Sequence, residues 1–226
     1  MIIQIYSLTS AKAACAVAKL GVDHIGFVAG RYNIVRSELN FDQARDLVKA
    51  RPSGVKSVAL TMATDVDEIM KMVDAVRPDI VHISTDPLDM DKAATQELGR
   101  RLPSHIQLMK AIPVGGSAET LDLIRRFEPV ADLFLLDTKV EGFPGVGATG
   151  HTHDWNVSRQ VVETTRRPVI LAGGLIPENV QESIKKVGPW GVDSCTGTNI
   201  PGTNEKDMAR VQEFVQAVRH WEQENA

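Results

Sequence analysis

Short runs of β-branched and aliphatic residues alternate along this chain with longer stretches in which apolar residues recur at helical spacing. Such alternation predicts strands that are each followed by a helix. The short runs predict eight strands, at Ile2–Tyr6, His24–Val28, Val55–Leu60, Ile80–Ile83, Ile106–Ile112, Leu133–Asp137, Val169–Ala172 and Gly191–Ser194. The longer stretches predict eight helices, near residues 10–20, 41–50, 65–76, 89–100, 118–127, 156–165, 177–186 and 205–222.

Residues at the expected helix ends support these boundaries. Asn40 is placed to cap the second helix, and Thr64 with Asp67 resembles a capping box before the third. Pro177 is tolerated in a first helical turn, and Gly188 follows the seventh helix, where a helix-ending glycine belongs.

Eight strand–helix units within 226 residues fit two α/β architectures. One is a closed (β/α)8 TIM barrel, and the other is an open, doubly wound sheet. The number of units favours the barrel, and the lack of a G-x-G-x-x-G motif after the first strand disfavours the dinucleotide-binding open sheet. Because no linker or shift in composition divides the chain, we expect a single barrel domain over residues 1–226.

Charge and cysteine content exclude several classes of function. The net charge is −4, from 25 Lys and Arg against 29 Asp and Glu, and no basic tract suggests a nucleic-acid partner. The two cysteines, Cys15 and Cys195, are too few for a disulfide framework and fit a reducing compartment. No apolar run is long enough to span a membrane. We therefore expect a cytoplasmic protein with no nucleic-acid or membrane partner.

Glycines cluster after the last two expected strands. In a barrel the active site lies at the carboxyl ends of the strands, and a phosphate site is common after strands seven and eight. Gly173 and Gly174 follow strand seven, and Thr196 and Gly197 follow strand eight. Glycine lets backbone N–H groups approach an anion closely, so these four residues predict a phosphate cradle. The plainer alternative is that they only tighten two loops.

The second half of the chain carries a series of motifs in a fixed order. It contains L-L-D at residues 135–137, G-A-T-G at 147–150, D-W at 154–155, P-V-I-L-A-G-G-L at 168–175, P-E-N-V at 177–180 and G-V-D at 191–193. In this order the motifs resemble the phosphoribosylanthranilate isomerase family, and a looser likeness extends over the first half.

The resemblance implies a (β/α)8 barrel that performs an Amadori rearrangement on a phosphorylated small molecule without a cofactor or metal. In that reaction an acid protonates the ring oxygen of the sugar, and a base then removes the proton from C2. The family places the acid on an aspartate that ends strand six, which corresponds to Asp137. It places the base on a cysteine that ends strand one.

This chain departs from the family pattern at the reacting end. The strand-one pattern K-I-C-G-x-T reads Gln4-Ile5-Tyr6-Ser7-Leu8-Thr9, so Tyr6 stands at the cysteine position. A phenol with a pKa near 10 is a poorer base at neutral pH than a thiol. Tyr6 is therefore either a replacement acid or base, or a residue that fills the pocket. If it replaces the base, its hydroxyl should face Asp137 across the mouth of the barrel.

Other departures lie on strands four and five. His82 replaces a glutamine and Ser84 a histidine of the family, and His82 is either a substitute base or a packed, hydrogen-bonded histidine. Lys110 either meets substrate or is a solvated rim lysine. The family's loop-two arginine has no clean counterpart, although Arg36 is the nearest substrate-binding candidate.

Two further groups favour plain structural roles. His151 and His153 are spaced like metal ligands, but they overlay a family segment that binds no metal, and Asp154 is placed to cap the next helix. Cys195 takes the place of a family serine beside the expected phosphate, which disfavours a chemical role.

Together these features predict an isomerase-type enzyme acting on a phosphorylated sugar or N-glycoside, as a monomer or homodimer. We expect its turnover of phosphoribosylanthranilate to be weak or absent. The alternative is a non-catalytic barrel that binds phosphosugars or has a regulatory role.

Overall fold

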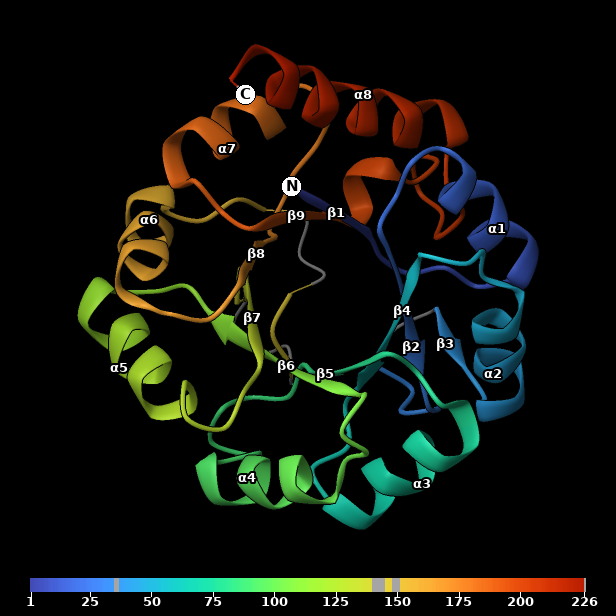
Figure 1. Cartoon of the computed structure of the whole chain (residues 1–226), viewed down its shortest axis with the longest axis vertical. Coiled ribbons are helices and arrows are strands. Elements are labelled where there is room, and N and C mark those ends of the chain that lie inside the picture. Colours follow the sequence, from blue (N-terminus) through green and yellow to red (C-terminus); the bar gives the residue numbers. More distant parts are fainter. Residues whose placement is uncertain (35–36, 140–144, 148–150, 226) are drawn as a thin grey trace.

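The computed structural model describes residues 1–34, 37–139, 145–147 and 151–225, and these form a closed parallel β-barrel surrounded by helices (Figure 1). The barrel strands are β1 (Ile2–Ile5), β2 (His24–Ala29), β4 (Lys56–Thr61), β5 (Ile80–Ile83), β6 (Gln107–Pro113), β7 (Leu133–Asp137), β8 (Val169–Leu171) and β9 (Gly191–Ser194). Each strand pairs with the next in this order, and β1 pairs with both β9 and β2, which closes the barrel.

A ring of eight helices covers the outside of the barrel, as Figure 1 shows. They are α1 (Ala11–Lys19), α2 (Phe41–Ala50), α3 (Val66–Val76), α4 (Lys92–Arg101), α5 (Ser117–Phe127), α6 (Trp155–Thr164), α7 (Val180–Val187) and α8 (Met208–Glu224). The predicted (β/α)8 barrel is confirmed, and every expected strand and helix is present. Two short elements were not predicted, the strand β3 (Glu38–Leu39) and the 3-10 helix η1 (Thr196–Thr198).

Among the described residues, no helix combines the length and the apolar character that crossing a membrane would require.

Residues along each strand alternate between two separate cores. One set of side chains fills the barrel interior, including Val58, Ile80, Met109, Leu133 and Ile170. The other set points outward and packs against the helices. Since successive side chains of a strand point to opposite sides, strand position decides whether a residue can reach the central cavity.

Helix caps follow the sequence closely, with two adjustments. Asn40 accepts a hydrogen bond from the N–H of Gln43, whose side chain accepts one from Asn40 in return, so this capping box is confirmed. Before α3 the cap is Asp65, and not Thr64 as expected. Pro177 lies in the turn before α7, which begins after Asn179.

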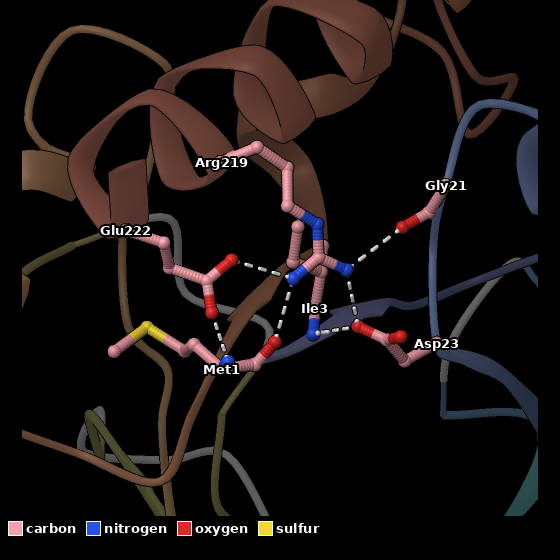
Figure 2. A network of polar contacts seen from close by, with 6 residues as sticks. All are labelled: Met1, Ile3, Gly21, Asp23, Arg219 and Glu222. Carbon is pink, nitrogen blue, oxygen red and sulfur yellow. Dashed lines mark hydrogen bonds and ion pairs between the residues drawn. The ribbon is translucent and has the colours of Figure 1, made fainter. Parts of the chain in front are cut away.

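The amino-terminal end of the barrel is closed by a polar network (Figure 2). The guanidinium group of Arg219 on α8 donates hydrogen bonds to Asp23, Glu222 and the carbonyl oxygens of Met1 and Gly21, at 2.8–3.1 Å. Asp23 also accepts the backbone N–H of Ile3 at 2.8 Å. The network ties the last helix to the first strand and so joins the two ends of the described chain.

The same backbone contact recurs around this end of the barrel. Asp79 accepts the N–H of Ser57, and Asp132 accepts the N–H of Leu108, in each case from the strand preceding its own. The aspartates that precede β2, β5 and β7 therefore each accept one backbone N–H group of the neighbouring strand. These donors at the amino-terminal end of the barrel are thus not left unpaired.

Candidate active site

A cavity of about 280 Å³ lies at the carboxyl ends of the barrel strands. It is lined by Tyr6, Ser7, Val28, Ser37, Leu60, Met62, His82, Ser84, Leu135, Asp137, Val146, Asp193, Cys195, Thr196, Asn199, Thr203 and Asn204. The barrel thus brings the predicted residues Tyr6, His82, Ser84, Asp137 and Thr196 to one place, although different strands and loops supply them.

Asp137 ends β7 and is buried at the cavity wall. Its carboxyl group accepts the backbone N–H of Thr138 at 2.7 Å, and burial raises its pKa to about 7. Two glycines make room for it. A Cβ atom at Gly147 would lie 2.2 Å from one carboxyl oxygen, and a Cβ at Gly173 would lie 3.2 Å from the other. A carboxyl group with a pKa near neutrality can donate or accept a proton, which suits acid–base chemistry.

Tyr6 crosses the barrel interior and meets His82. Its ring packs over Gly26, where a Cβ atom would lie 2.7 Å from ring atoms, and its hydroxyl group lies 2.7 Å from Nδ1 of His82. The two residues that replace the family's cysteine and glutamine therefore contact each other directly. The hydroxyl group of Tyr6 is tied to His82 and is not free to face Asp137 as a base would.

Burial keeps both members of this pair neutral. Desolvation, with the nearby Asp193 and Cys195, holds the pKa of the Tyr6 hydroxyl well above its usual range. Burial, with the charge of Lys110, lowers the pKa of His82 to about 3. Within the described part of the chain, Nε2 of His82 has no hydrogen-bond partner. A neutral tyrosine beside a neutral histidine makes a weak base near pH 7.

The loops after β8 and β9 present unpaired backbone donors beside the cavity. Gly173 and Gly174 adopt positive φ angles of 83° and 62°. In the part of the chain that the structure describes, the N–H groups of Gly173, Gly174, Thr196 and Gly197 donate no hydrogen bond.

The two loops also touch each other. A Cβ atom at Gly197 would lie 2.3 Å from the carbonyl oxygen of Leu175, and Ser194 donates a hydrogen bond to that same oxygen at 2.8 Å. Adjacent loops with unpaired N–H groups, one of them opening the helix η1, can receive an anion such as a phosphate.

Lys206, which was not predicted as a site residue, holds the second loop in place. Its buried ammonium group donates to the carbonyl oxygen of Cys195 at 2.8 Å and to the side chains of Asn199 and Thr198 at 2.6 and 3.3 Å. The charge therefore lies directly beneath the turn that carries Thr196. A single lysine 10 residues downstream of a glycine turn carries little signal by itself.

Asp193 is a second missed residue of the cavity. It is 5% exposed, and its Oδ1 atom accepts a hydrogen bond from the side chain of Gln4 at 3.1 Å. Burial, with the charge of Asp137, raises its pKa to about 8. The G-V-D motif at residues 191–193 marked the strand, but only the inward direction of the side chain places Asp193 beside Asp137.

The remaining predicted substrate-binding residues differ in their position relative to the cavity. Ser84 lines the cavity, and its hydroxyl group donates to the carbonyl oxygen of Val146 at 2.8 Å. Lys110 is not brought to the cavity, because it points outward from β6 and donates to the carbonyl oxygen of Thr85 at 3.2 Å beside the ring of Phe127. Arg36 lies outside the described residues.

The alternation of β6 explains the misplacement of Lys110. Its neighbours Met109 and Ala111 take the inward positions, so an expectation based only on nearness to the strand end chose the wrong side.

The plain structural expectation for the histidine pair fits the geometry. The two ring nitrogens of His153 lie 3.2 Å from the hydroxyl of Thr138 and 2.7 Å from that of Ser158, and Asp154 caps α6. The described residues contain no group of three or more His, Cys, Asp or Glu side chains that could hold a metal ion. Desolvation raises the pKa of the Cys195 thiol, which keeps it protonated.

The fold and the cavity together define a class: a (β/α)8 barrel with a buried carboxyl group at a cavity beside two glycine-containing loops. Residues 3–217 match the family described as N-(5'-phosphoribosyl)anthranilate isomerase, so the chain belongs to that family.

Curated relatives and solved structures agree with this assignment. The chain is 37% identical over 205 residues to the N-(5'-phosphoribosyl)anthranilate isomerase of Methanothrix thermoacetophila, and the aligned residues make up 91% of this chain and 91% of the relative. It is 36% identical to that of Methanocella arvoryzae, with 96% of this chain and 97% of the relative covered. The structure of the enzyme from Pyrococcus furiosus is 25% identical, with a TM-score of 0.78 over 97% of this chain and 99% of that one.

Proposed function

We propose that this chain catalyses the Amadori-type isomerisation of a phosphorylated N-glycoside, with phosphoribosylanthranilate as the first substrate to test. One observation carries the proposal: a buried carboxyl group, Asp137, with a pKa near 7 lines a cavity flanked by loops with four unpaired N–H groups. An anion site and an acid at one cavity are what a reaction on a phosphosugar needs.

The residues divide the work between two ends of the cavity. Gly173, Gly174, Thr196 and Gly197 bind the phosphate, and Lys206 fixes the second of these loops from beneath. Asp137 donates a proton to the ring oxygen, so the ring opens and the nitrogen lone pair forms an imine. Removal of the C2 proton then gives the enol, which becomes the ketose.

Incubation of the purified protein with phosphoribosylanthranilate, followed by loss of the substrate's fluorescence, tests the proposal. We expect weak turnover, because Tyr6 stands at the position of the family's cysteine. The control is Asp137→Asn, which keeps the shape of the side chain but cannot donate the proton.

Two outcomes would contradict the proposal in different ways. Turnover of ordinary efficiency would contradict the expectation of weak activity. Binding of a product analogue without turnover of any phosphorylated N-glycoside would support the alternative, a non-catalytic phosphosugar-binding barrel. Sedimentation of the same samples distinguishes the monomer from the homodimer.

A further inference from the structure

The cavity has lost the family's cysteine, so a different group must remove the C2 proton if the proposed reaction takes place. Among the residues that the structure describes, the titratable side chains that line the cavity are Tyr6, His82, Asp137, Asp193 and Cys195. The hydroxyl group of Tyr6 and a ring nitrogen of His82 are bonded to each other, and the Cys195 thiol lies 3.1 Å from the hydroxyl of Ser7. The two carboxyl groups are the remaining candidates.

Asp137 and Asp193 lie in one row inside the barrel. The parallel register of β7, β8 and β9 places Asp137, Ala172 and Asp193 side by side, one position beyond the last paired residues. Two strand spacings of about 4.8 Å separate the two backbones, and both side chains point inward. Only the methyl group of Ala172 stands between them on this row, so the two carboxyl groups face one space.

A hydrogen-bonded chain behind Asp193 fixes its orientation. Gln4 donates from its amide nitrogen to Oδ1 of Asp193, and its amide oxygen lies 3.2 Å from Nδ1 of His24. All three residues are at least 95% buried, and Gln4 is paired in register with both of the others. Because the amide oxygen of Gln4 is hydrogen-bonded to His24, its amide nitrogen must point to Asp193. The Oδ2 atom of Asp193 has no hydrogen bond within the described residues.

The residue at position 4 also sets the charge around Asp193. The family pattern K-I-C-G-x-T has a lysine where this chain has Gln4, so a cation has been replaced by a neutral amide. Among the described residues, the charged and titratable groups around Asp193 are Asp137 on β7, Tyr6 directly after β1, Cys195 after β9 and Lys206 before α8, with His24 on β2 behind Gln4. Lys206 is already engaged with three oxygen atoms of the loop.

We infer that Asp193 and Asp137 share one proton as an acid–base pair, that Asp193 supplies the base this chain lost at strand one, and that Gln4 and His24 are its positioning residues. The inference rests on the proposed function. Two carboxyl groups in one buried space cannot both ionise easily, so near neutrality one holds a proton while the other is a base. Their pKa values, about 7 and about 8, place the titration of both groups near neutral pH, so the reactive form, with the proton on Asp137 and the charge on Asp193, is accessible there although Asp193 holds a proton more tightly.

The proton balance closes on this pair. The protonated carboxyl group gives its proton to the ring oxygen as the C1–O bond breaks and the C=N bond forms. The ionised carboxyl group then takes the proton from C2, whose electrons form the C=C bond while the C=N electrons return to nitrogen. The pair ends with the same single proton on the other member, so no external acid or base is consumed.

Carboxyl NMR of protein labelled with ¹³C-aspartate tests the pair without any substrate. We expect Asp193 to titrate above pH 6 in the wild type and to shift at least half a pH unit lower in Asp137→Asn. In Gln4→Lys, which restores the family's cation, we expect a downward shift of more than one pH unit. The control Asp132→Asn, on the opposite end of the barrel, should leave the titration unchanged. A wild-type Asp193 that titrates below pH 5, or one that neither variant moves, would overturn the inference.

Kinetics test the role in the reaction. Asp193→Asn should lower kcat by a factor of about 10²–10⁴ with little change in KM, and Gln4→Lys should move the acidic limb of the pH profile of kcat/KM lower. Wild-type kcat in Asp193→Asn would overturn the inference, and a loss in Cys195→Ser instead would assign the base to the thiol. If the wild type turns over no substrate, the proposed function fails, whereas the titration still supports or refutes the shared proton.

Discussion

At the amino-terminal end of the barrel Asp23, Asp79 and Asp132 each accept a backbone N–H group, whereas at the carboxyl end two buried acidic side chains line the same cavity. Asp23 receives Arg219 and a backbone N–H group, and Asp79 receives Arg51 at 2.9 Å as well as Ser57. Hydrogen bonds and the charge of Arg51 hold the pKa of Asp79 below its usual value.

Among the described residues neither Asp137 nor Asp193 forms an ion pair, and burial raises the pKa values of both. The two ends of the barrel thus use aspartate for two different purposes. Paired carboxylates hold strand edges together, while unpaired, buried carboxyl groups keep a proton available near neutral pH. The following changes test this division.

Asp137→Asn should remove most of the activity. The amide cannot donate a proton to the ring oxygen, so we expect kcat to fall by a factor of about 10²–10⁴. Steady-state fluorescence assays measure the loss. The matched variant at the other end of the barrel, Asp132→Asn, should keep wild-type kinetics, and a comparable loss in both variants would contradict the division.

Gly197→Ala should weaken substrate binding. A Cβ atom there would lie 2.3 Å from the carbonyl oxygen of Leu175, so the loop must move. The N–H group of residue 197 then no longer points toward the expected position of the phosphate. We expect KM to rise about tenfold or more, because each tenfold loss corresponds to only about 1.4 kcal/mol of binding energy. Gly116→Ala, where a Cβ atom would meet no other atom within 4 Å and φ is not positive, is the control.

The same carboxyl group should make stability depend on pH. Asp137 has a folded-state pKa of about 7, above the roughly 3.9 of an unfolded chain. Between these values the folded state binds more protons, so the free energy of unfolding of the wild type should fall as pH rises. Relative to Asp137→Asn, we expect a slope of up to about 1.4 kcal/mol per pH unit between pH 4 and 7.

Urea unfolding of both proteins at several pH values measures this difference. The two stability curves should run parallel above about pH 8, where Asp137 is ionised in both states. A difference that grows with pH above that point, or one that is flat throughout, would show that Asp137 is not a buried neutral acid.

Tyr6→Phe should cost stability but not turnover. Loss of the hydroxyl group leaves Nδ1 of His82 without its partner in the barrel interior, which costs about 1–3 kcal/mol. Because Tyr6 is held neutral and tied to His82, we expect kcat to stay within about twofold. Urea unfolding and fluorescence assays measure the two effects, and a large fall in kcat would identify Tyr6 as the base.

Arg219→Ala should have the smallest effect and only on stability. Its four hydrogen bonds join α8 to β1 at the amino-terminal end, but the side chain is about one-third exposed, so we expect a loss of about 1–2 kcal/mol. Arg126→Ala removes an exposed pair with Asp122 on α5 and should cost less. Altered kinetics in Arg219→Ala would show that the two ends of the barrel are linked.

The sequence by itself determined the order and type of the elements. Alternation between short apolar runs and amphipathic stretches fixes strand and helix locally, so their positions were predicted within a few residues. The two pairs of residues after strands seven and eight, and Asp137, were proposed as site residues on a different ground. Barrel geometry assigns the ends of strands to the active face before any coordinates are known.

Tertiary structure decided which side chains meet. The contact between Tyr6 and His82 joins residues 76 positions apart, and the bond between Gln4 and Asp193 joins residues 189 apart. Lys110 was misplaced because one step along a strand reverses the direction of a side chain, and that register is set by packing around the whole barrel. The pKa values of the buried carboxyl groups depend on burial and distant neighbours, which the sequence pattern does not determine.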